Sequence, residues 1–277
     1  VHDMIERNHI DLGSIRTGVF GMSGADTRRQ HANIAREVEK IGLADFMVCN
    51  DSFLGIKAGT RDGFGICVIN GSGCTVSGIN RSGRMFSIGG QGEYTGEQGG
   101  GGFLGYCAIR SVYDQLFREG NKTLMKDMLF DTCRIDSKYE FMDVVRGKIE
   151  DGEITVKDLA RMVFHAANHS DKVALDILRH MGDEIGISVN GVIRELDFAG
   201  HEELDIILAG SVNAKGENDT YINALKTKVL CEQEIPRIHF SILRQPPVIG
   251  AVLWAFERAF GTCAFRDKIH MQLSNMS

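Results

Sequence analysis

The pattern of hydrophobic and polar positions predicts alternating strands and helices at the start of the chain. Residues 15–21 and 45–49 are short, almost continuous apolar runs, which are typical of buried strands. Residues 27–41 between them carry apolar side chains at helical spacing, and Gly42 is the predicted C-cap of that helix. A second helix is predicted at residues 53–58. This order is the pattern of a sheet covered by helices.

After residue 63 the pattern changes to adjacent strands with short turns, followed by long amphipathic helices. The apolar runs 65–69 and 85–88 predict strands of a β-hairpin or meander that opens a second α/β unit. Residues 171–196 form the longest predicted helix, which we expect to pack on the second sheet. The remaining predicted helices are 103–118, 123–141, 155–169, 219–228 and 249–260, and the remaining strands are 203–208 and 237–243.

The strands 65–69 and 85–88 lead into two glycine clusters, Gly71-Ser72-Gly73 and residues 89–102. Glycine lets backbone N–H groups converge on an anion because no Cβ stands in the way. A strand that ends in such a turn holds phosphate in many proteins. The same spacing is typical of hairpin turns in an antiparallel sheet, so spacing alone leaves both interpretations open.

Composition and charge narrow the class of partner. The chain has 277 residues, of which 43% are hydrophobic and 25% charged, as in an ordinary globular protein. The net charge of -6 is spread over both signs without a basic block, which argues against a nucleic-acid or anionic-membrane partner. No apolar run reaches about 18 residues, so we predict no transmembrane span, and we expect no signal peptide.

The 7 cysteines are odd in number, far apart and mostly within apolar stretches. We therefore expect reduced, buried thiols in a cytoplasmic protein. No two of them stand at the spacing of a zinc or iron–sulfur ligand pair. They are Cys49, Cys67, Cys74, Cys107, Cys133, Cys231 and Cys263.

His165 and His169 share one face of a predicted helix and are followed by Asp171, which raises the question of a metal site. No carboxylate pair on a nearby predicted helix completes a zinc-type site. Solvated or helix-terminal side chains are therefore the preferred interpretation. We predict no metal site built from protein side chains.

Five short glycine-containing stretches occur in order between residues 18 and 255: NDSFLGIKAG, INGSG, IGGQG with GEQGGGGFLG, LAGSV, and PPVIGAVLWA. Together they resemble the N-acetylglucosamine kinase and BadF/BadG/BcrA/BcrD ATPase family of the actin, Hsp70 and sugar-kinase superfamily. Each stretch has low specificity by itself, and the ordered set is moderately specific.

The resemblance implies two ribonuclease-H-like domains of the actin-like ATPase class, with ATP and substrate in the cleft between them. The first domain would comprise residues 1–62 and the second residues 63–277, with the last helix as a candidate to pack back on the first domain. The family's first phosphate loop, a DGGGT-type turn, precedes the matched region and is lacking in this sequence.

By resemblance, Asp51 is the carboxylate that accepts the proton of the attacking sugar hydroxyl, and Asn50 beside it belongs to the substrate site. An aspartate in this position is also typical of an N-cap for the helix that follows. Asp26 lies in a turn that would face the cleft, where it could contact substrate or cap the next helix.

By resemblance, the turn 71–73 is the family's second phosphate loop, with backbone N–H groups and the Ser72 hydroxyl as donors. Cys74 replaces the family's serine and removes one donor. Gly210 and Ser211 would form the adenosine loop, although a glycine after a strand is more often only a turn.

By resemblance, Gly90, Gln91 and Glu97 belong to the sugar site. Glu97 stands where the family has an aspartate that holds sugar hydroxyls, and Gln91 stands where kinases often have tryptophan. Gln98 and Gly100 replace the family's glutamate and serine. These departures weaken the assignment of N-acetylglucosamine more than that of ATP.

The leading hypothesis is an ATP-dependent kinase of N-acetylglucosamine or a related amino sugar, with Mg²⁺ carried by ATP. The second hypothesis is a family ATPase that activates a partner enzyme, although no cysteine pair stands in the required glycine-rich context. The third is a non-catalytic nucleotide- or sugar-binding protein. The long helices offer either a homodimer surface or packing faces within the domain.

Overall fold

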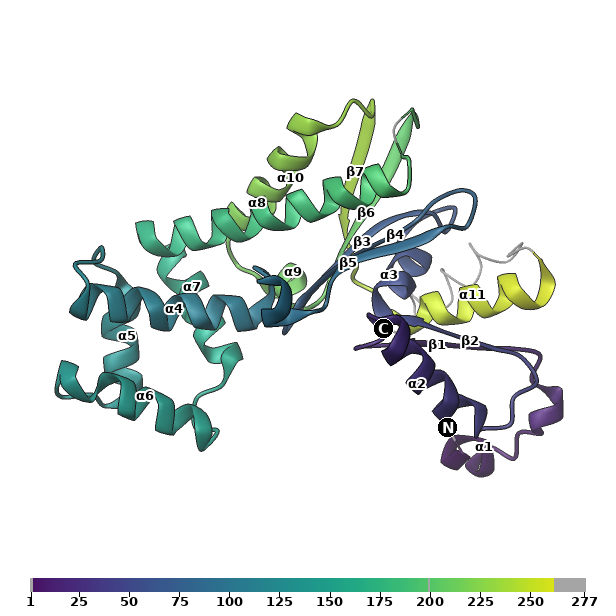
Figure 1. Ribbon diagram of the computed structural model, residues 1–277, viewed down its shortest axis with the longest axis horizontal. Helices are drawn as coiled ribbons and strands as arrows, with labels where there is room; N and C mark the ends of the chain where they lie inside the picture. Colours follow the sequence, from purple (N-terminus) through teal and green to yellow (C-terminus); the bar gives the residue numbers. More distant parts are fainter. Residues whose placement is uncertain (1, 199, 262–277) are drawn as a thin grey trace.

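The computed structural model describes residues 2–198 and 200–261, and its strands form two sheets of unequal size (Figure 1). β1 (Gly18–Met22) and β2 (Phe46–Asn50) make a two-stranded parallel sheet. The larger sheet has the strand order β5-β4-β3-β6-β7, so the prediction of a mixed α/β fold is confirmed. Its strands are β3 (Gly65–Asn70), β4 (Cys74–Ile79), β5 (Met85–Gly89), β6 (Glu203–Ala209) and β7 (Arg237–Ile242).

The strands β3, β4 and β5 form an antiparallel meander, and β6 and β7 run parallel to β3. Successive side chains of β3 point to opposite faces, because the side-chain period of a strand is two. Ile66 and Val68 join the large hydrophobic core, whereas Cys67 joins a smaller core on the other face. Both faces of the sheet are therefore covered.

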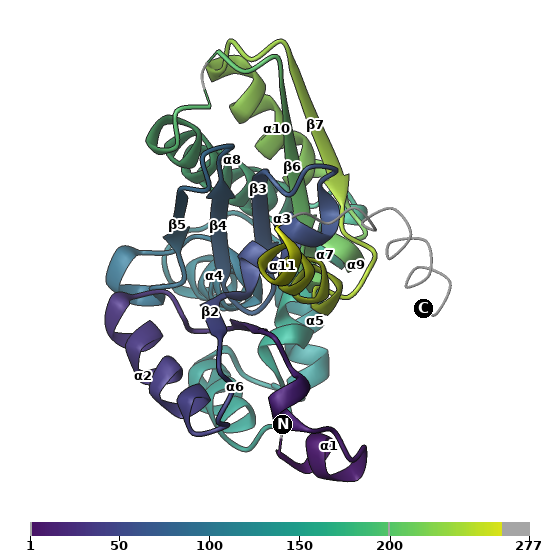
Figure 2. The same ribbon diagram turned by 90° about the vertical axis from the view of Figure 1, so that its right-hand side faces the viewer.

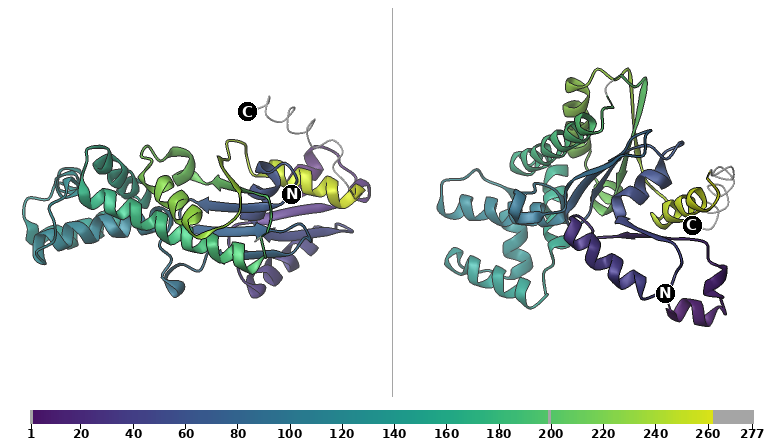
Figure 3. Two further views of the ribbon diagram at one scale, coloured as in Figure 1. Left: turned by 90° about the horizontal axis from the view of Figure 1, so that it is seen from above. Right: turned by 45° about the vertical axis from the view of Figure 1, so that its right-hand side comes forward.

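The large core lies between the sheet and a layer of helices, which extends away from β1 and β2 (Figure 3). As predicted, the longest helix packs on β4 and β5. The helices of this part are α4 (Gly100–Phe117), α5 (Leu124–Cys133), α6 (Phe141–Glu150), α7 (Val156–Asn168), α8 (Lys172–Glu195), α9 (Ser211–Lys215) and α10 (Thr220–Glu232), with the short 3-10 helices η2 (Gly92–Thr95) and η3 (Lys138–Glu140).

The helix α2 (Arg28–Glu39) connects the parallel strands β1 and β2. It begins with a capping box, in which the Thr27 hydroxyl accepts the N–H of Gln30 and the Gln30 side chain accepts the N–H of Thr27. The helix α3 (Asp51–Gly59) follows β2 directly and lies on the five-stranded sheet. The chain before β1 forms α1 (His2–Arg7) and the 3-10 helix η1 (Leu12–Ser14).

The last helix, α11 (Val248–Phe260), packs against α3 and β1 on the face of the sheet that the large helical layer leaves free (Figure 2). Gly250 allows the close approach, because a Cβ there would lie 2.0 Å from the carbonyl oxygen of Leu54. Lys57 Nζ of α3 donates to Glu257 Oε2 of α11 at 2.6 Å, which also links these two helices. The division of the chain into 1–62 and 63–277 stays a prediction.

Two predictions of helix ends are wrong. The helix predicted over 123–141 is broken, because α5 ends at Cys133 and Arg134 adopts a left-handed conformation with φ 57°. Glycine or asparagine usually fills such a position, so an arginine there gives no signal in the sequence. The C-cap of α2 is Lys40 rather than Gly42, and the short α9 was not predicted.

The cysteines are buried with two exceptions among the described residues. Cys107 is half-buried and Cys231 is exposed, whereas Cys263 lies outside the described residues. All six described cysteines are free thiols, and burial raises the pKa of Cys49 to about 12. Among the described residues no helix is both long and apolar enough to span a membrane.

The contact between α8 and α10 provides a test of packing against helix propensity. Alanine is favoured over glycine by about 1 kcal/mol in a helix interior. A Cβ on Gly182, however, would lie 2.4 Å from the carbonyl oxygen of Tyr221 and 2.7 Å from Ala224 Cβ. We expect Gly182→Ala to lower the free energy of unfolding, because overpacking costs about 1–3 kcal/mol.

The matched control is Gly147→Ala in α6, where a Cβ would meet no atom within 4 Å. This variant should be neutral or more stable by up to about 1 kcal/mol. Urea unfolding followed by circular dichroism measures both variants. Equal stabilisation by the two substitutions would contradict the close approach of α8 and α10.

Candidate active site

The glycine turn 71–73 connects β3 to β4 and is therefore a hairpin turn. One N–H is used inside the turn, since Gly71 N donates to Gly73 O at 2.9 Å. The exposed N–H groups of Ser72 and Gly73 have no protein acceptor in the part of the chain that the structure describes. The segment is therefore a hairpin turn that can also bind an anion, because it presents two backbone N–H donors and the Ser72 hydroxyl to a ligand.

The N-terminus of α4 docks on this turn through three backbone N–H groups. Gly100 N donates to Asn70 Oδ1 at 2.8 Å, Gly101 N to Gly71 O at 2.8 Å and Gly102 N to Ser72 O at 3.0 Å. A helix start without a side-chain cap needs such acceptors for its first N–H groups. Gly100 has φ 85°, and a Cβ on it would lie 2.4 Å from Ser72 O.

The loop after β6 also contacts the turn, because β3 and β6 are parallel neighbours. Gly210 has φ 93°, and a Cβ on it would lie 2.5 Å from Asn70 O. Only glycine fits this place without strain. Ser211, the next residue, begins α9. The predicted adenosine loop and the predicted phosphate loop are therefore adjacent.

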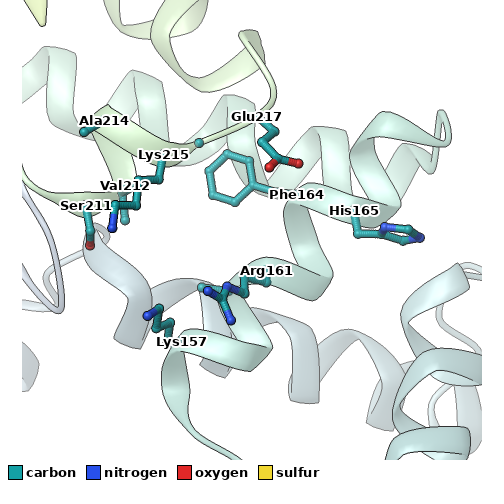
Figure 4. Close-up of a pocket in the computed structure, with 11 residues that line it drawn as sticks. Lys157, Arg161, Phe164, His165, Ser211, Val212, Ala214, Lys215 and Glu217 are labelled. Carbon is teal, nitrogen blue, oxygen red and sulfur yellow. The ribbon is translucent and has the colours of Figure 1, made fainter.

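A pocket of about 720 Å³ opens beside Ser211, and three of its lining side chains are cationic (Figure 4). Lys157 and Arg161 come from one face of α7, and Lys215 comes from the end of α9. Glu217 is the acidic residue of this lining. The excess of positive charge suits a polyphosphate ligand.

The cations of this pocket were not predicted as site residues. Their spacing of four residues on α7 was visible in the sequence, but Lys and Arg are frequent on exposed helix faces. Only the position of α9 opposite that face identifies them as pocket residues.

Asp51 is the first residue of α3, and the N-cap is Asn50 instead. Asn50 Oδ1 accepts the N–H of Ser52 at 2.9 Å, so the interpretation of Asp51 as the helix cap is wrong. Burial raises the pKa of the Asp51 carboxyl, and backbone N–H groups of Ser52 and Asp51 oppose that shift. A raised pKa makes a carboxylate a stronger base.

Asp26 lies close to the Asp51 carboxylate. Asn50 Nδ2 donates to Asp26 Oδ1 at 2.7 Å, and Thr27 rather than Asp26 caps α2. Burial raises the pKa of Asp26, and the negative charges of Asp51 and Glu97 raise it further. The turn after β1, the start of α3 and the loop after β5 therefore meet at one place.

Glu97 is held by backbone groups from two segments. Its Oε1 accepts the N–H of Cys74 at 2.7 Å, and its Oε2 accepts that of Gly90 at 2.7 Å and that of Gly92 at 3.4 Å. Gln91 is half-buried in the same loop. The assignment of Gly90, Gln91, Glu97 and Asn50 to the sugar site stays a prediction.

Asp171 is the N-cap of α8 and also contacts the start of α5. Its Oδ1 accepts the N–H of Ala174 in α8 at 2.9 Å, and its Oδ2 accepts the N–H of Leu124 in α5 at 2.6 Å. The rings of His165 and His169 lie 4.4 Å apart at the end of α7. Among the described residues no group of three or more His, Cys, Asp or Glu side chains is placed to hold a metal ion.

Comparison with known proteins identifies relatives over most of the chain. A family profile described as the BadF/BadG/BcrA/BcrD ATPase family matches residues 1–255. The N-acetylmuramic acid/N-acetylglucosamine kinase of Clostridium acetobutylicum is 26% identical over 238 residues, 85% of this chain and 76% of that protein. The N-acetyl-D-glucosamine kinase of Dictyostelium discoideum is 24% identical over 254 residues, 90% of this chain and 77% of that protein.

The fold also matches solved structures. The crystal structure of a proposed N-acetylglucosamine kinase from Chromobacterium violaceum has a TM-score of 0.61 at 20% identity. The alignment covers 91% of this chain and 80% of that one. At 20% identity this similarity shows the fold alone.

The raised pKa of Asp51 predicts that Asp51→Asn stabilises the protein at neutral pH. The folded state binds its proton more tightly than the unfolded state, so the free energy of unfolding falls as pH rises through the interval between the two pKa values. At neutral pH the carboxylate is ionised, so the free energy of unfolding is reduced by the full effect of the raised pKa. Asparagine has no charge and removes this effect. Urea unfolding at a series of pH values should show that Asp51→Asn has a higher free energy of unfolding than the wild type at neutral pH. This difference should disappear below about pH 4.

Asp158→Asn is the control of opposite sign. The side chain and backbone N–H of Thr155 lower the pKa of Asp158, so its ionised form favours the folded state. This variant should be less stable than the wild type at neutral pH. A loss of stability in Asp51→Asn at neutral pH would contradict the burial of its charge.

Proposed function

Because the chain belongs to the BadF/BadG/BcrA/BcrD ATPase family, we propose that it transfers the γ-phosphate of ATP to a hydroxyl of N-acetylglucosamine or a related amino sugar. The two relatives named as N-acetylglucosamine kinases support this substrate class. The observation that carries the proposal is the combination of a turn with unused donors, a cationic pocket and a half-buried carboxylate of raised pKa.

ATP fits the residues beside the turn. Lys157, Arg161 and Lys215 would neutralise phosphate charge, and the small residues Gly210 and Ser211 would let the adenosine approach the backbone. The N–H groups of the turn 71–73 would then hold the terminal phosphates. Mg²⁺ would arrive with ATP, bound mainly by phosphate oxygens and water, and would neutralise the charge that develops on the transferred group.

Asp51 would act as the base. Phosphoryl transfer needs a positioned nucleophile and an acceptor for its proton, and a half-buried carboxylate of raised pKa supplies that acceptor. Asn50 would fix the orientation of Asp26 beside it. The sugar would lie between the two sheets, in a cleft between domains 1–62 and 63–277, so closure would exclude water.

The function is tested by ADP release from the full-length protein with a panel of sugars. We expect turnover with N-acetylglucosamine or a close analogue, and a loss of about 10²–10⁴-fold in kcat for Asp51→Asn, the usual contribution of a general base. The acid limb of the kcat profile should lie above the ordinary range of an aspartate, because burial raises the pKa of Asp51.

Full activity of Asp51→Asn would contradict the role of Asp51. Sugar-independent hydrolysis of ATP would favour the partner-activating ATPase, and binding of nucleotide without transfer would favour the non-catalytic protein. The panel includes glucose, which lacks the acetamido group, and N-acetylmuramic acid, which adds a lactyl group. These two sugars show which of the groups determines specificity.

The cationic pocket predicts a specific effect on ATP. We expect Lys157→Ala combined with Arg161→Ala to raise the KM for ATP by roughly 2- to 30-fold, since each exposed charge contributes about 0.2–1 kcal/mol. The KM for the sugar should remain unchanged. The effect should shrink at high salt, because exposed charges are screened.

Arg146→Ala in α6 is the matched control, since this arginine is exposed and lies outside the pocket. It should leave the KM for ATP at the wild-type value. Equal KM values for ATP in the double variant and in Arg146→Ala would exclude the pocket as the phosphate site.

A further inference from the structure

The Glu97 side chain bridges the phosphate turn to the loop that follows β5. Its Oε1 accepts the N–H of Cys74, the residue directly after the turn, at 2.7 Å. Its Oε2 accepts the N–H of Gly90 at 2.7 Å and that of Gly92 at 3.4 Å. The two segments are also joined directly, because Thr75 pairs with Gly89 and Gly90 N donates to Cys74 O at 3.0 Å. The carboxylate adds a second link between the predicted phosphate site and the predicted sugar site and extends it to Gly92.

The bridge leaves little capacity for a substrate hydroxyl. A carboxylate has about four acceptor positions on its two oxygens. Three backbone N–H groups already use these oxygens, with charge-assisted hydrogen bonds that are stronger than neutral ones. A sugar hydroxyl would therefore compete with the backbone for Glu97.

The glycines around the carboxylate are required by its position. A Cβ on Gly73 would lie 2.9 Å from Glu97 Oε1, so a side chain there would push the carboxylate away from Cys74. Gly90 has φ 74°, a conformation that L side chains rarely adopt. A Cβ on Gly90 would also lie 2.4 Å from Asp26 Oδ1.

We propose that Glu97 is a positioning residue that couples nucleotide binding at the turn 71–73 to the order of the sugar loop 89–92. This inference rests on the proposed function and assigns Glu97 a role through backbone groups instead of sugar hydroxyls. Phosphate on the N–H groups of Ser72 and Gly73 fixes the turn and Cys74. Glu97 carries that restraint to Gly90 and Gly92, in addition to the direct hydrogen bond from Gly90 N to Cys74 O. Gly90 lies next to Asp26 and the acceptor site.

The length of the side chain suits this role. Glu97 reaches both segments from a loop that is closed by its own backbone, since the Glu97 N–H donates to Gly92 O at 3.1 Å. Aspartate, one methylene shorter, could hold only one of the two segments from the same backbone position. Glutamine keeps the length but replaces one acceptor oxygen by an NH₂ group, which cannot accept an N–H.

The geometry is tested first by hydrogen exchange of the unliganded full-length protein. Glu97→Gln and Glu97→Asp should speed amide exchange at Cys74 and Gly92, because the acceptor of these N–H groups is lost. The change at Gly90 should be smaller, because its N–H also donates to Cys74 O at 3.0 Å. Glu184→Gln is the matched control, since Glu184 lines the small cavity beside Glu97 and its side chain makes no hydrogen bond to the loop in the described part of the chain. Unchanged exchange in both Glu97 variants would overturn the bridge.

The coupling is tested next with a non-hydrolysable ATP analogue alone. In the wild type and in Glu184→Gln, the analogue should slow exchange in the segment 89–92. Gly90 is the informative residue there, because Gly92 lines the cavity at the turn together with Ser72 and Gly73, whereas Gly90 does not. In Glu97→Gln it should slow exchange in the turn, and the slowing at Gly90 should be smaller than in the wild type. Equal slowing of the segment 89–92 in Glu97→Gln would overturn the coupling, whatever the identity of the sugar.

The functional consequence is measured by calorimetry with N-acetylglucosamine and the ATP analogue. In the wild type each ligand should tighten the other by the same factor, in the usual range of about 5- to 150-fold. The factor should fall toward one in Glu97→Gln, while the Kd of the analogue alone stays within about twofold. Retention of that Kd shows that the variant is folded.

Deoxy sugars distinguish positioning from direct binding. If Glu97 only positions the loop, Glu97→Gln weakens every deoxy analogue of N-acetylglucosamine by the same factor as the parent sugar. If it binds a hydroxyl directly, the substitution has no effect on the analogue that lacks that hydroxyl, and the proposal is wrong. Absence of any sugar binding by the wild type would reject the proposed function, whereas the exchange experiments would still decide the role of Glu97.

Discussion

The docking of the α4 N-terminus on the turn after β3 is the contact on which the site depends. Gly100, Gly101 and Gly102 donate their N–H groups to Asn70 Oδ1, Gly71 O and Ser72 O. These bonds provide acceptors for N–H groups of the first helical turn, which have no partner within the helix. They also fix the side of the turn on which its carbonyl oxygens lie. The opposite side, with the N–H groups of Ser72 and Gly73, stays open to a ligand. The same glycines that start α4 therefore orient the candidate phosphate site.

The glycines of this region have different physical roles, although they look alike in the sequence. Gly100 and Gly210 permit close backbone approach to Ser72 and Asn70, and each has a positive φ. Gly73 makes room for the Glu97 carboxylate, whereas a Cβ on Gly71 would meet no atom within 4 Å. Several glycines of the cluster thus serve packing, whereas the short turn presents unused donors. A substitution at each position should be interpreted by the atom that it would meet.

The helix α3 joins the two sheets, and two half-buried acids, Asp51 and Asp26, lie at its start. Its cap, Asn50, donates to Asp26 in the turn after β1, and Ser52 Oγ lies 2.5 Å from Ser77 Oγ of the five-stranded sheet. Gly55 lies against Cys67, where a Cβ would be 2.4 Å from Sγ. Asp51, the first residue of this helix, is half-buried, and burial raises its pKa. Stability is thereby lost at neutral pH, as is common where a charged group is held ready for chemistry.

Hydrophobic periodicity in the sequence predicted nearly every strand and helix, because a buried face imposes its period on the chain regardless of the partner that covers it. Short motifs also indicated the turn 71–73, Asp51 and the loop at Gly210. The tertiary structure alone decided the cationic pocket of Lys157 and Arg161, since an exposed cation becomes a pocket residue only when another element lies opposite. It also decided that Glu97 binds backbone N–H groups, because hydrogen-bond partners depend on distances between segments that no local pattern encodes.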